Sequence, residues 1–127
     1  MAKILIVDDS ETLRGQVKKD LESAGHGTLE AADGINGMEV FESNRGSIDL
    51  ILCDVNMPRL DGLSMVSKLY ENNGGNIPPV FMLTTECSSE MKTKGKSVGV
   101  VAWMTKPYSK EKMTVAVAKA LEKFKRQ

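Results

Sequence analysis

Residues 3–9, Lys-Ile-Leu-Ile-Val-Asp-Asp, contain four consecutive apolar side chains that are followed by two carboxylates. Three later apolar runs also lead into polar side chains: residues 50–53 into Asp54, residues 80–83 into Thr84, and residues 101–104 into the segment with Lys106. Short, continuously apolar runs are typical of parallel strands that are buried on both faces. Because the carboxyl ends of parallel strands meet at one edge of a sheet, this pattern predicts a shared pocket there. The pocket would hold three carboxylates, a hydroxyl and an ammonium group.

The apolar runs alternate with segments of helical period, which predicts a single α/β domain built from five strand–helix units. We expect strands at residues 3–7, 28–32, 49–53, 79–84 and 100–105. Right-handed crossovers place helices on both faces of such a sheet. Residues 28–32 are the most polar of the five, as an edge strand should be, which favours the flavodoxin-like (βα)₅ order 2-1-3-4-5. Residues 88–98 contain Gly95 and few large apolar side chains, so we expect the weakest helix there.

The overall numbers fit one cytoplasmic domain. The chain has 127 residues, and we interpret residues 1–127 as one domain. Lys plus Arg and Asp plus Glu both number 17, so the balance of charge favours neither a nucleic acid nor a membrane surface as partner. No apolar run approaches the length of a membrane span or of a signal peptide. Cys53 lies in an apolar run and is expected to be a buried thiol, as in a reducing compartment.

The predicted pocket has the chemistry of a divalent cation and a phosphoryl group. Asp8, Asp9 and Asp54 repel one another unless a cation or a proton compensates them. Ligands that are all oxygen suit Mg²⁺. Lys106 can pair with Asp54 at rest and with a phosphoryl oxygen later, and the Thr84 hydroxyl can donate to the phosphoryl group. Asp54 is then a plausible nucleophile, and the chain has neither a P-loop nor a dinucleotide-binding glycine motif.

The whole chain resembles the receiver domain of two-component response regulators, and single-domain, chemotaxis-type (CheY-like) receivers in particular. The resemblance rests on four segments: residues 7–10 (VDDS), 54–62 (DVNMPRLDG), 83–86 (LTTE) and 103–108 (WMTKPY). It implies that Asp54 is the phosphoacceptor. It also implies that Asp9, Asp54 and the backbone carbonyl of Asn56 ligate Mg²⁺, with Asp8 nearby or acting through a water molecule. Thr84 and Lys106 would contact the phosphoryl group, and the bond from Lys106 to Pro107 would be cis.

Further positions carry roles that only the resemblance implies. Trp103 takes the place of a switch aromatic residue that turns inward as Thr84 moves, and Asn56 and Glu86 match positions that tune the lifetime of the phosphoryl group. The chain departs from the family pattern at Thr85, where a smaller residue is commoner, and at Trp103, which is larger than the usual Tyr or Phe. Extra bulk at Thr85 would slow phosphoryl entry and exit, and Trp103 would need more room to turn inward.

Simpler interpretations exist for several of these residues. Asp8 and Asp9 precede a helix and would also serve as N-caps, and Asp8 with Glu11 has capping-box spacing. Asp61-Gly62 is better explained as a turn than as part of the site. Thr84 and Thr85 fit a strand, and Trp103 would also serve as a core residue of an edge strand.

The function expected from these observations is a phosphorylation switch and not an enzyme, beyond catalysis of its own phosphorylation and dephosphorylation. A histidine kinase would donate the phosphoryl group. The product would alter the face formed by the fourth helix, fifth strand and fifth helix for a downstream target protein, with the flagellar motor switch as one candidate. We expect a monomer with no nucleic-acid or membrane partner. The alternatives are a phosphate sink, a phosphorelay intermediate, a non-phosphorylated interaction module, or an aspartyl phosphohydrolase. Asn56 disfavours the last, because such enzymes often keep an acid at that position.

Overall fold

The chain alternates strand and helix five times, as the sequence pattern predicts. The computed structural model describes residues 2–85 and 87–124. The strands are β1 (Lys3–Val7), β2 (Gly27–Ala31), β3 (Leu50–Cys53), β4 (Val80–Thr84) and β5 (Val100–Thr105). The helices are α1 (Glu11–Ser23), α2 (Gly34–Ser43), α3 (Gly62–Asn72), α4 (Ser89–Ser97) and α5 (Lys110–Lys123). Each predicted strand is present, with boundaries that differ by at most one residue from those expected.

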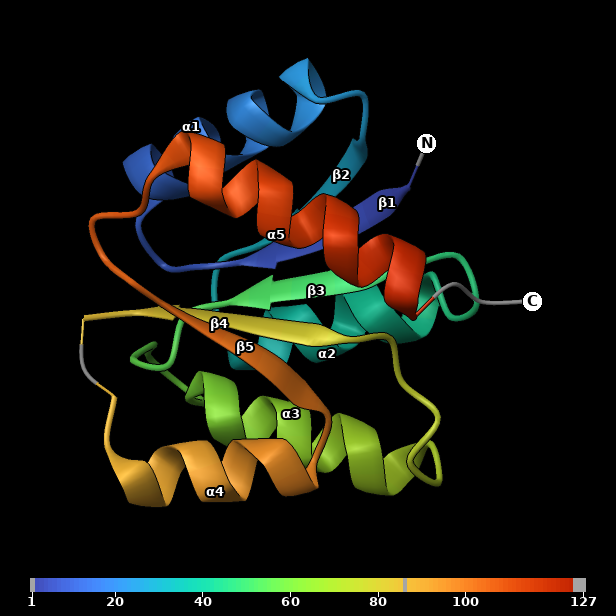
Figure 1. Cartoon of the computed structure of the whole chain (residues 1–127). Helices are drawn as coiled ribbons and strands as arrows, with labels where there is room; N and C mark the ends of the chain where they lie inside the picture. The colour runs from blue at the N-terminus through green and yellow to red at the C-terminus, as the bar shows by residue number, and fades with distance from the viewer. Residues whose placement is uncertain (1, 86, 125–127) are drawn as a thin grey trace.

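The five strands form one parallel sheet in the order β2-β1-β3-β4-β5, which confirms the predicted flavodoxin-like topology. Helices α1 and α5 cover one face, and α2, α3 and α4 cover the other (Figure 1). The carboxyl ends of the strands lie toward the left of Figure 1, and both chain ends lie toward the right. The strand ends that carry the polar residues therefore share one edge.

The core consists of two apolar layers, one on each face of the sheet. Along β1, Ile4 and Ile6 belong to the layer under α1 and α5, whereas Leu5 and Val7 belong to the layer under α2, α3 and α4. This alternation explains why the strand is apolar throughout, because side chains at successive positions enter opposite layers. Strand β2 forms one edge of the sheet, and Ala31 is the one residue of this strand that is buried, as its polar sequence predicts. Among residues 2–85 and 87–124, the structure has no helix with the length and apolarity that crossing a membrane requires.

Candidate functional site

Three carboxylates gather at the carboxyl edge of the sheet. Asp8 follows β1 and Asp54 follows β3, and these strands are hydrogen-bonded neighbours. One carboxylate oxygen from each of Asp8, Asp9 and Asp54 lies within 4.8 Å of the others. Asp8 and Asp54 are buried, with 4% and 6% of their surface exposed, while Asp9 is exposed. The structure thus brings together the three acids that the sequence placed at the ends of two separate strands.

The Lys106 ammonium lies between two of these acids. Its Nζ is 3.1 Å from Asp8 Oδ2 and 3.2 Å from Asp54 Oδ2. The sequence predicted the pairing with Asp54, and the structure adds Asp8 as a second partner. Burial alone would lower the pKa of Lys106, but its hydrogen bonds and ion pairs with Asp8 and Asp54 raise that pKa. Lys106 therefore remains a cation in the pocket.

Asp54 is held in an environment that disfavours its charge. Burial raises the pKa of the Asp54 carboxyl, and the opposing attraction of Lys106 does not cancel this effect. Cys53, the preceding residue, is buried, and its thiol donates to the Asp54 carbonyl oxygen at 3.1 Å. Burial also raises the pKa of Cys53 well above its usual range, so this thiol stays protonated. A buried carboxylate that lies beside a second carboxylate is stabilised when another cation binds.

The backbone around Asp8 is fixed by interactions on both sides. The Asp8 N–H donates to Ala31 O at 3.1 Å, and the Asp8 carbonyl accepts from Arg14 Nη1 at 2.6 Å. The N-cap of α1 is Ser10, whose hydroxyl oxygen accepts from the Leu13 N–H. Asp8 instead accepts from the Ser10 N–H at 2.8 Å, outside the helix. The capping-box interpretation of Asp8 is therefore wrong, and its second carboxylate oxygen faces Lys106.

Thr84 and Lys106 are joined through the backbone of neighbouring strands. The Lys106 N–H donates to the Thr84 carbonyl at 2.8 Å, which fixes the end of β5 against the end of β4. The Thr84 side chain is fully buried, whereas the Thr85 side chain is exposed. The Lys106–Pro107 peptide is cis, as the resemblance implied. Thr84 is thus at the predicted edge, but in this structure its side chain is enclosed.

The loop between β3 and α3 holds the remaining expected ligand. Asn56 is exposed, and its N–H lies 3.4 Å from Asp54 Oδ1, the long end of a hydrogen bond. Asp61 caps α3, because its carboxylate accepts from the Ser64 N–H at 2.9 Å. This capping agrees with the interpretation of Asp61-Gly62 as a turn. Glu86, a predicted tuning residue, lies outside the described residues.

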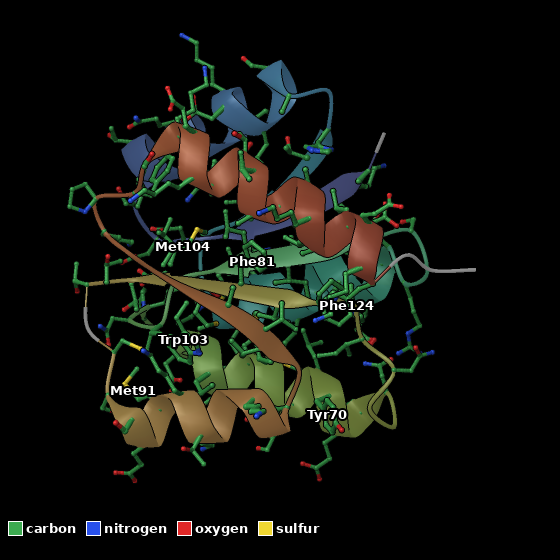
Figure 2. All side chains as sticks on the ribbon, in the orientation of Figure 1. Tyr70, Phe81, Met91, Trp103, Met104 and Phe124 are labelled. Atoms are coloured by element: carbon green, nitrogen blue, oxygen red, sulfur yellow. The ribbon has the colours of Figure 1, made fainter. Side chains whose placement is uncertain are left out.

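Trp103 lies on the α4 side of the sheet. Figure 2 shows it between β5 and α4, with Met91 nearby, while Met104 and Phe81 point to the opposite layer. Its side chain is partly buried against the core layer under α2, α3 and α4. A Cβ atom added at Gly95 would lie 2.8 Å from the Trp103 ring. The position fits both a core residue and a switch residue, and the rotation expected of a switch stays a prediction.

The acid cluster fits the metal that the resemblance implied. Three carboxylates supply oxygen ligands within the spacing of one coordination sphere, and hard cations such as Mg²⁺ prefer such ligands. Lys106 compensates two of the acids only in part, since the pKa of Asp54 is still raised. The residues present therefore fit a divalent cation at this edge.

A family model for the response regulator receiver domain matches residues 4–118. The chain belongs to the response regulator receiver family. Among curated relatives, chemotaxis protein CheY1 of Helicobacter pylori is 32% identical, with 91% of this receiver and 96% of that protein aligned. Protein PilG of Pseudomonas aeruginosa is 31% identical over 96% of the receiver and 89% of the relative.

A solved structure of similar shape supports a CheY-like receiver. Chemotaxis protein CheY4 of Vibrio cholerae is 37% identical, with a TM-score of 0.86, and the match covers 95% of this receiver and 99% of that chain. The receiver also matches the sensor histidine kinase CheAY of Helicobacter pylori at 31% identity, but it spans only 15% of that protein's length. Two-component signalling is therefore the setting that the relatives indicate.

The sequence did not indicate every residue that shapes the site. Arg14 binds the Asp8 carbonyl and also pairs with Glu30 through Nε at 3.2 Å. In the sequence, this role of Arg14 is indicated by its position alone. Arg14 lies four residues after the N-cap, where its side chain can reach back to the end of the preceding strand. Tyr108 donates a hydrogen bond to Asp20 Oδ2 at 2.6 Å, which links the segment after Lys106 to α1. The sequence signal for this pair was an acid on the apolar stripe of a helix.

Proposed function

We propose that this receiver accepts a phosphoryl group on Asp54 from a phosphohistidine of a histidine kinase, with Mg²⁺ as cofactor. The observation that carries the proposal is the joint position of Asp54, two further carboxylates and the Lys106 ammonium at one strand edge. The relatives support the setting, because one is itself named a sensor histidine kinase and others are named chemotaxis proteins.

The chemistry is a displacement at phosphorus. An Asp54 carboxylate oxygen forms the new bond to phosphorus, while the bond from phosphorus to the histidine nitrogen breaks. The imidazole keeps the electron pair of that bond. Hydrolysis later transfers the phosphoryl group to water and restores the carboxylate. Burial raises the pKa of the Asp54 carboxyl although Lys106 lies beside it, so the ionised form that attacks phosphorus depends on the cations in the pocket.

The residues around Asp54 would have two roles: some would bind the metal, and others would contact the phosphoryl group. Asp8, Asp9, Asp54 and the Asn56 carbonyl would hold Mg²⁺, which when bound neutralises negative charge on the transferred oxygens. Lys106 already lies between two acids, so its ammonium can pass from Asp54 to a phosphoryl oxygen with a small movement. Thr84 would donate its hydroxyl hydrogen bond once its buried side chain turns toward the phosphoryl group. Thr85, which is exposed beside the pocket, would affect the rate of entry and exit.

We infer that the output surface is the face formed by α4, β5 and α5. Helix α4 is loosely packed against the sheet. Within Ser89–Ser97, Gly95 is the single residue that is buried. Phosphorylation adds charge that Lys106 and Thr84 would approach, and these residues end β5 and β4. Trp103 lies between β5 and α4 and would report or transmit the resulting movement. The target would be a protein of a motility or chemotaxis system, with the flagellar motor switch as one candidate.

The receiver would act as a cytoplasmic monomer and would catalyse only its own phosphorylation and dephosphorylation. A phosphate sink and a phosphorelay intermediate use the same site chemistry and differ from this proposal in their partners. A non-phosphorylated interaction module would not require the acid cluster that is present here.

Phosphorylation with a small donor tests the proposal. The protein is mixed with acetyl phosphate and Mg²⁺ while the fluorescence of Trp103, the single tryptophan, is followed and intact mass is measured. We expect a mass increase of one phosphoryl group and a change in fluorescence. Both should be absent in Asp54→Asn and in the presence of EDTA.

The two readouts separate two parts of the proposal. A mass increase that persists in Asp54→Asn would show that Asp54 is not the acceptor. A phosphorylated protein with unchanged fluorescence would leave the acceptor in place and remove the proposed role of Trp103.

The metal site has a test that needs no phosphodonor. Mg²⁺ at millimolar concentration should raise the melting temperature by mass action, since the folded protein assembles the three acids. In Asp54→Asn the rise should be smaller, and the metal-free variant should melt above the metal-free wild type, because burial no longer opposes a charge at residue 54. A wild-type melting curve that ignores Mg²⁺ would contradict the proposed cofactor.

A further inference from the structure

The loop between β3 and α3 is bound at its far end to the start of α2. The Arg59 guanidinium makes two parallel hydrogen bonds with Asp33, from Nε to Oδ2 at 2.9 Å and from Nη2 to Oδ1 at 3.0 Å. This bidentate geometry is the strongest form of an arginine–carboxylate contact. The same loop carries Asn56, whose carbonyl is an expected metal ligand. The Arg59–Asp33 pair therefore joins the metal-binding loop to another element of the fold.

Asp33 is a rigid anchor for this contact. Its Oδ1 also accepts from the Asn36 N–H at 2.8 Å, so the carboxylate caps α2. Hydrogen bonds from Arg59 and from the Asn36 amide lower the pKa of Asp33, which keeps it ionised. Gly34 then allows a close approach of the loop, because a Cβ atom there would lie 2.3 Å from the Leu60 carbonyl oxygen. The far end of the loop thus rests directly on the first turn of α2.

Arg59 pays for this contact with an unfavourable backbone conformation. Its φ is 67°, and within residues 2–85 and 87–124 no other residue except glycine has a positive φ. The left-handed region is costly for a side chain with a Cβ atom, so it persists where surrounding contacts impose it. A further hydrogen bond, from the Gly62 N–H to Val55 O at 2.8 Å, joins the start of α3 to the beginning of the loop. Both ends of the loop are therefore held, and Asn56 lies between them.

We propose that the Asp33–Arg59 pair is a positioning device for the metal site. It holds the loop so that Asn56 stays beside Asp54, to whose carboxylate its N–H already points at 3.4 Å. A ligand loop that is ordered before binding loses less entropy when the cation binds. Contacts behind the ligands commonly affect metal affinity for this reason. The inference rests on the proposed Mg²⁺ site and adds two residues that do not touch the ion.

The solvent exposure of Arg59 allows a positioning role at the metal site to be distinguished from a purely structural role in folding stability. The Arg59 side chain is 57% exposed and the Asp33 side chain 13% exposed, and an ion pair with one exposed partner contributes modestly to folding stability. Loss of the pair should therefore lower the metal-free unfolding midpoint only slightly and should weaken Mg²⁺ binding. A merely structural contact would lower the metal-free midpoint and leave the Mg²⁺ affinity of the folded protein unchanged.

Charge effects and positioning effects also have different signs. Arg59→Gln removes a positive charge and would strengthen cation binding if only long-range electrostatics mattered. Asp33→Asn removes a negative charge and would weaken binding on the same ground, while Asn still caps α2. The positioning role predicts that both substitutions weaken binding.

The experiment is a calorimetric titration of the metal-free protein with MgCl₂ at pH 7. We expect Kd to rise about tenfold in Arg59→Gln and in Asp33→Asn. The double variant should bind no more weakly than either single one, because one interaction is lost in all three. Arg59→Lys, which keeps the charge but not the two parallel bonds, should fall between wild type and Arg59→Gln.

Arg45 supplies a matched control. It is an exposed arginine that pairs with Glu42 at the end of α2, away from the strand edge that holds the acids. Arg45→Gln removes the same charge and should leave Kd within twofold of wild type.

The outcomes are distinguishable. Wild-type protein that does not bind Mg²⁺ would overturn the proposed metal site. Wild-type binding with an unchanged or lower Kd in Arg59→Gln would overturn the positioning role alone. So would an equal loss of affinity in Arg45→Gln, or effects of the two single substitutions that multiply in the double variant.

Discussion

The two sides of β5 are covered in different ways. On one side, α5 buries Met113, Val117 and Ala120 in the core. On the other side, the single buried residue of α4 within Ser89–Ser97 is Gly95. Met91, in the same helix, and Val98, at its end, are partly exposed. The α5 side also has the hydrogen bond from Tyr108 to Asp20, which ties the start of α5 to α1. The difference indicates a firmly packed frame on the α5 side and, on the α4 side, a helix that would lose few buried contacts if it moved.

This asymmetry suits a switch. The proposed phosphoryl transfer needs the backbone of Lys106 in a constant place while its ammonium moves, and the residues after Lys106 lead into the firmly packed side. The proposed output needs an element that responds to a small change at the pocket, and α4 has few buried contacts to lose. The well-buried helix α5 and the sparsely buried helix α4 thus match the two requirements.

The largest expected effect comes from truncating equivalent side chains on the two helices. Met113→Ala, at a fully buried position on α5, should lower the free energy of unfolding by about 2–5 kcal/mol. Met91→Ala, on α4, should lower it by less than about 1 kcal/mol, because its side chain is partly exposed. Urea denaturation of both variants without metal measures the difference. Equal losses would remove the contrast between the two sides.

A smaller effect is expected from the tie between α5 and α1. Tyr108→Phe should destabilise the protein by about 1–2 kcal/mol, because the buried Asp20 carboxylate loses a short hydrogen bond and is left with the more distant Lys110 ammonium at 4.0 Å. Denaturation at neutral pH measures this loss. If Tyr108→Phe is as stable as wild type, the tie does not hold the frame.

The same pair predicts a dependence on alkaline pH. Burial and the hydrogen bond with Asp20 raise the pKa of Tyr108 in the folded state. The stabilisation is therefore complete below the tyrosine pKa of the unfolded chain, about 10, and is lost as pH rises toward the higher folded value. Wild type should keep its advantage over Tyr108→Phe below about pH 10, the tyrosine pKa of the unfolded chain, and lose it progressively as pH rises above that value. A constant difference across that range would show that the hydroxyl does not contribute through this pair.

The smallest effect concerns two glycines in helices. Gly15, in α1, has no atom near the position of an added Cβ, so Gly15→Ala should stabilise the protein by about 0.5–1 kcal/mol. Gly95→Ala should give no such gain, because its Cβ would lie 2.8 Å from the Trp103 ring. The ring must then shift, so the fluorescence of Trp103 should change in Gly95→Ala and not in Gly15→Ala. Equal stabilisation of both variants with unchanged fluorescence would show that Gly95 does not make room for the tryptophan.

Most of the site was predictable because it depends on strand ends. Asp8, Asp9, Asp54 and Lys106 directly follow or lie close to the ends of apolar runs, and parallel pairing brings such ends to one edge whatever the helices do. The resemblance to receivers added roles for Asn56 and Trp103 that no periodicity reveals. The interpretation of Gly95 was incomplete. The sequence indicated only an unfavourable residue for a helix, whereas in the structure the absence of a side chain at Gly95 leaves room for the Trp103 ring.

The contacts behind the site were not predictable in this way. Asp20 meets Tyr108 across 88 positions, and Arg59 meets Asp33 across 26 positions. Such meetings depend on how each helix is rotated and how far each loop reaches, and these follow from the packing of the whole core. Strand order and the placement of chemistry at strand ends follow from local patterns of apolar residues, which each segment carries independently of the others. The pairing of one surface side chain with another requires the positions of both segments at once, and folding supplies these through contacts distant in the chain.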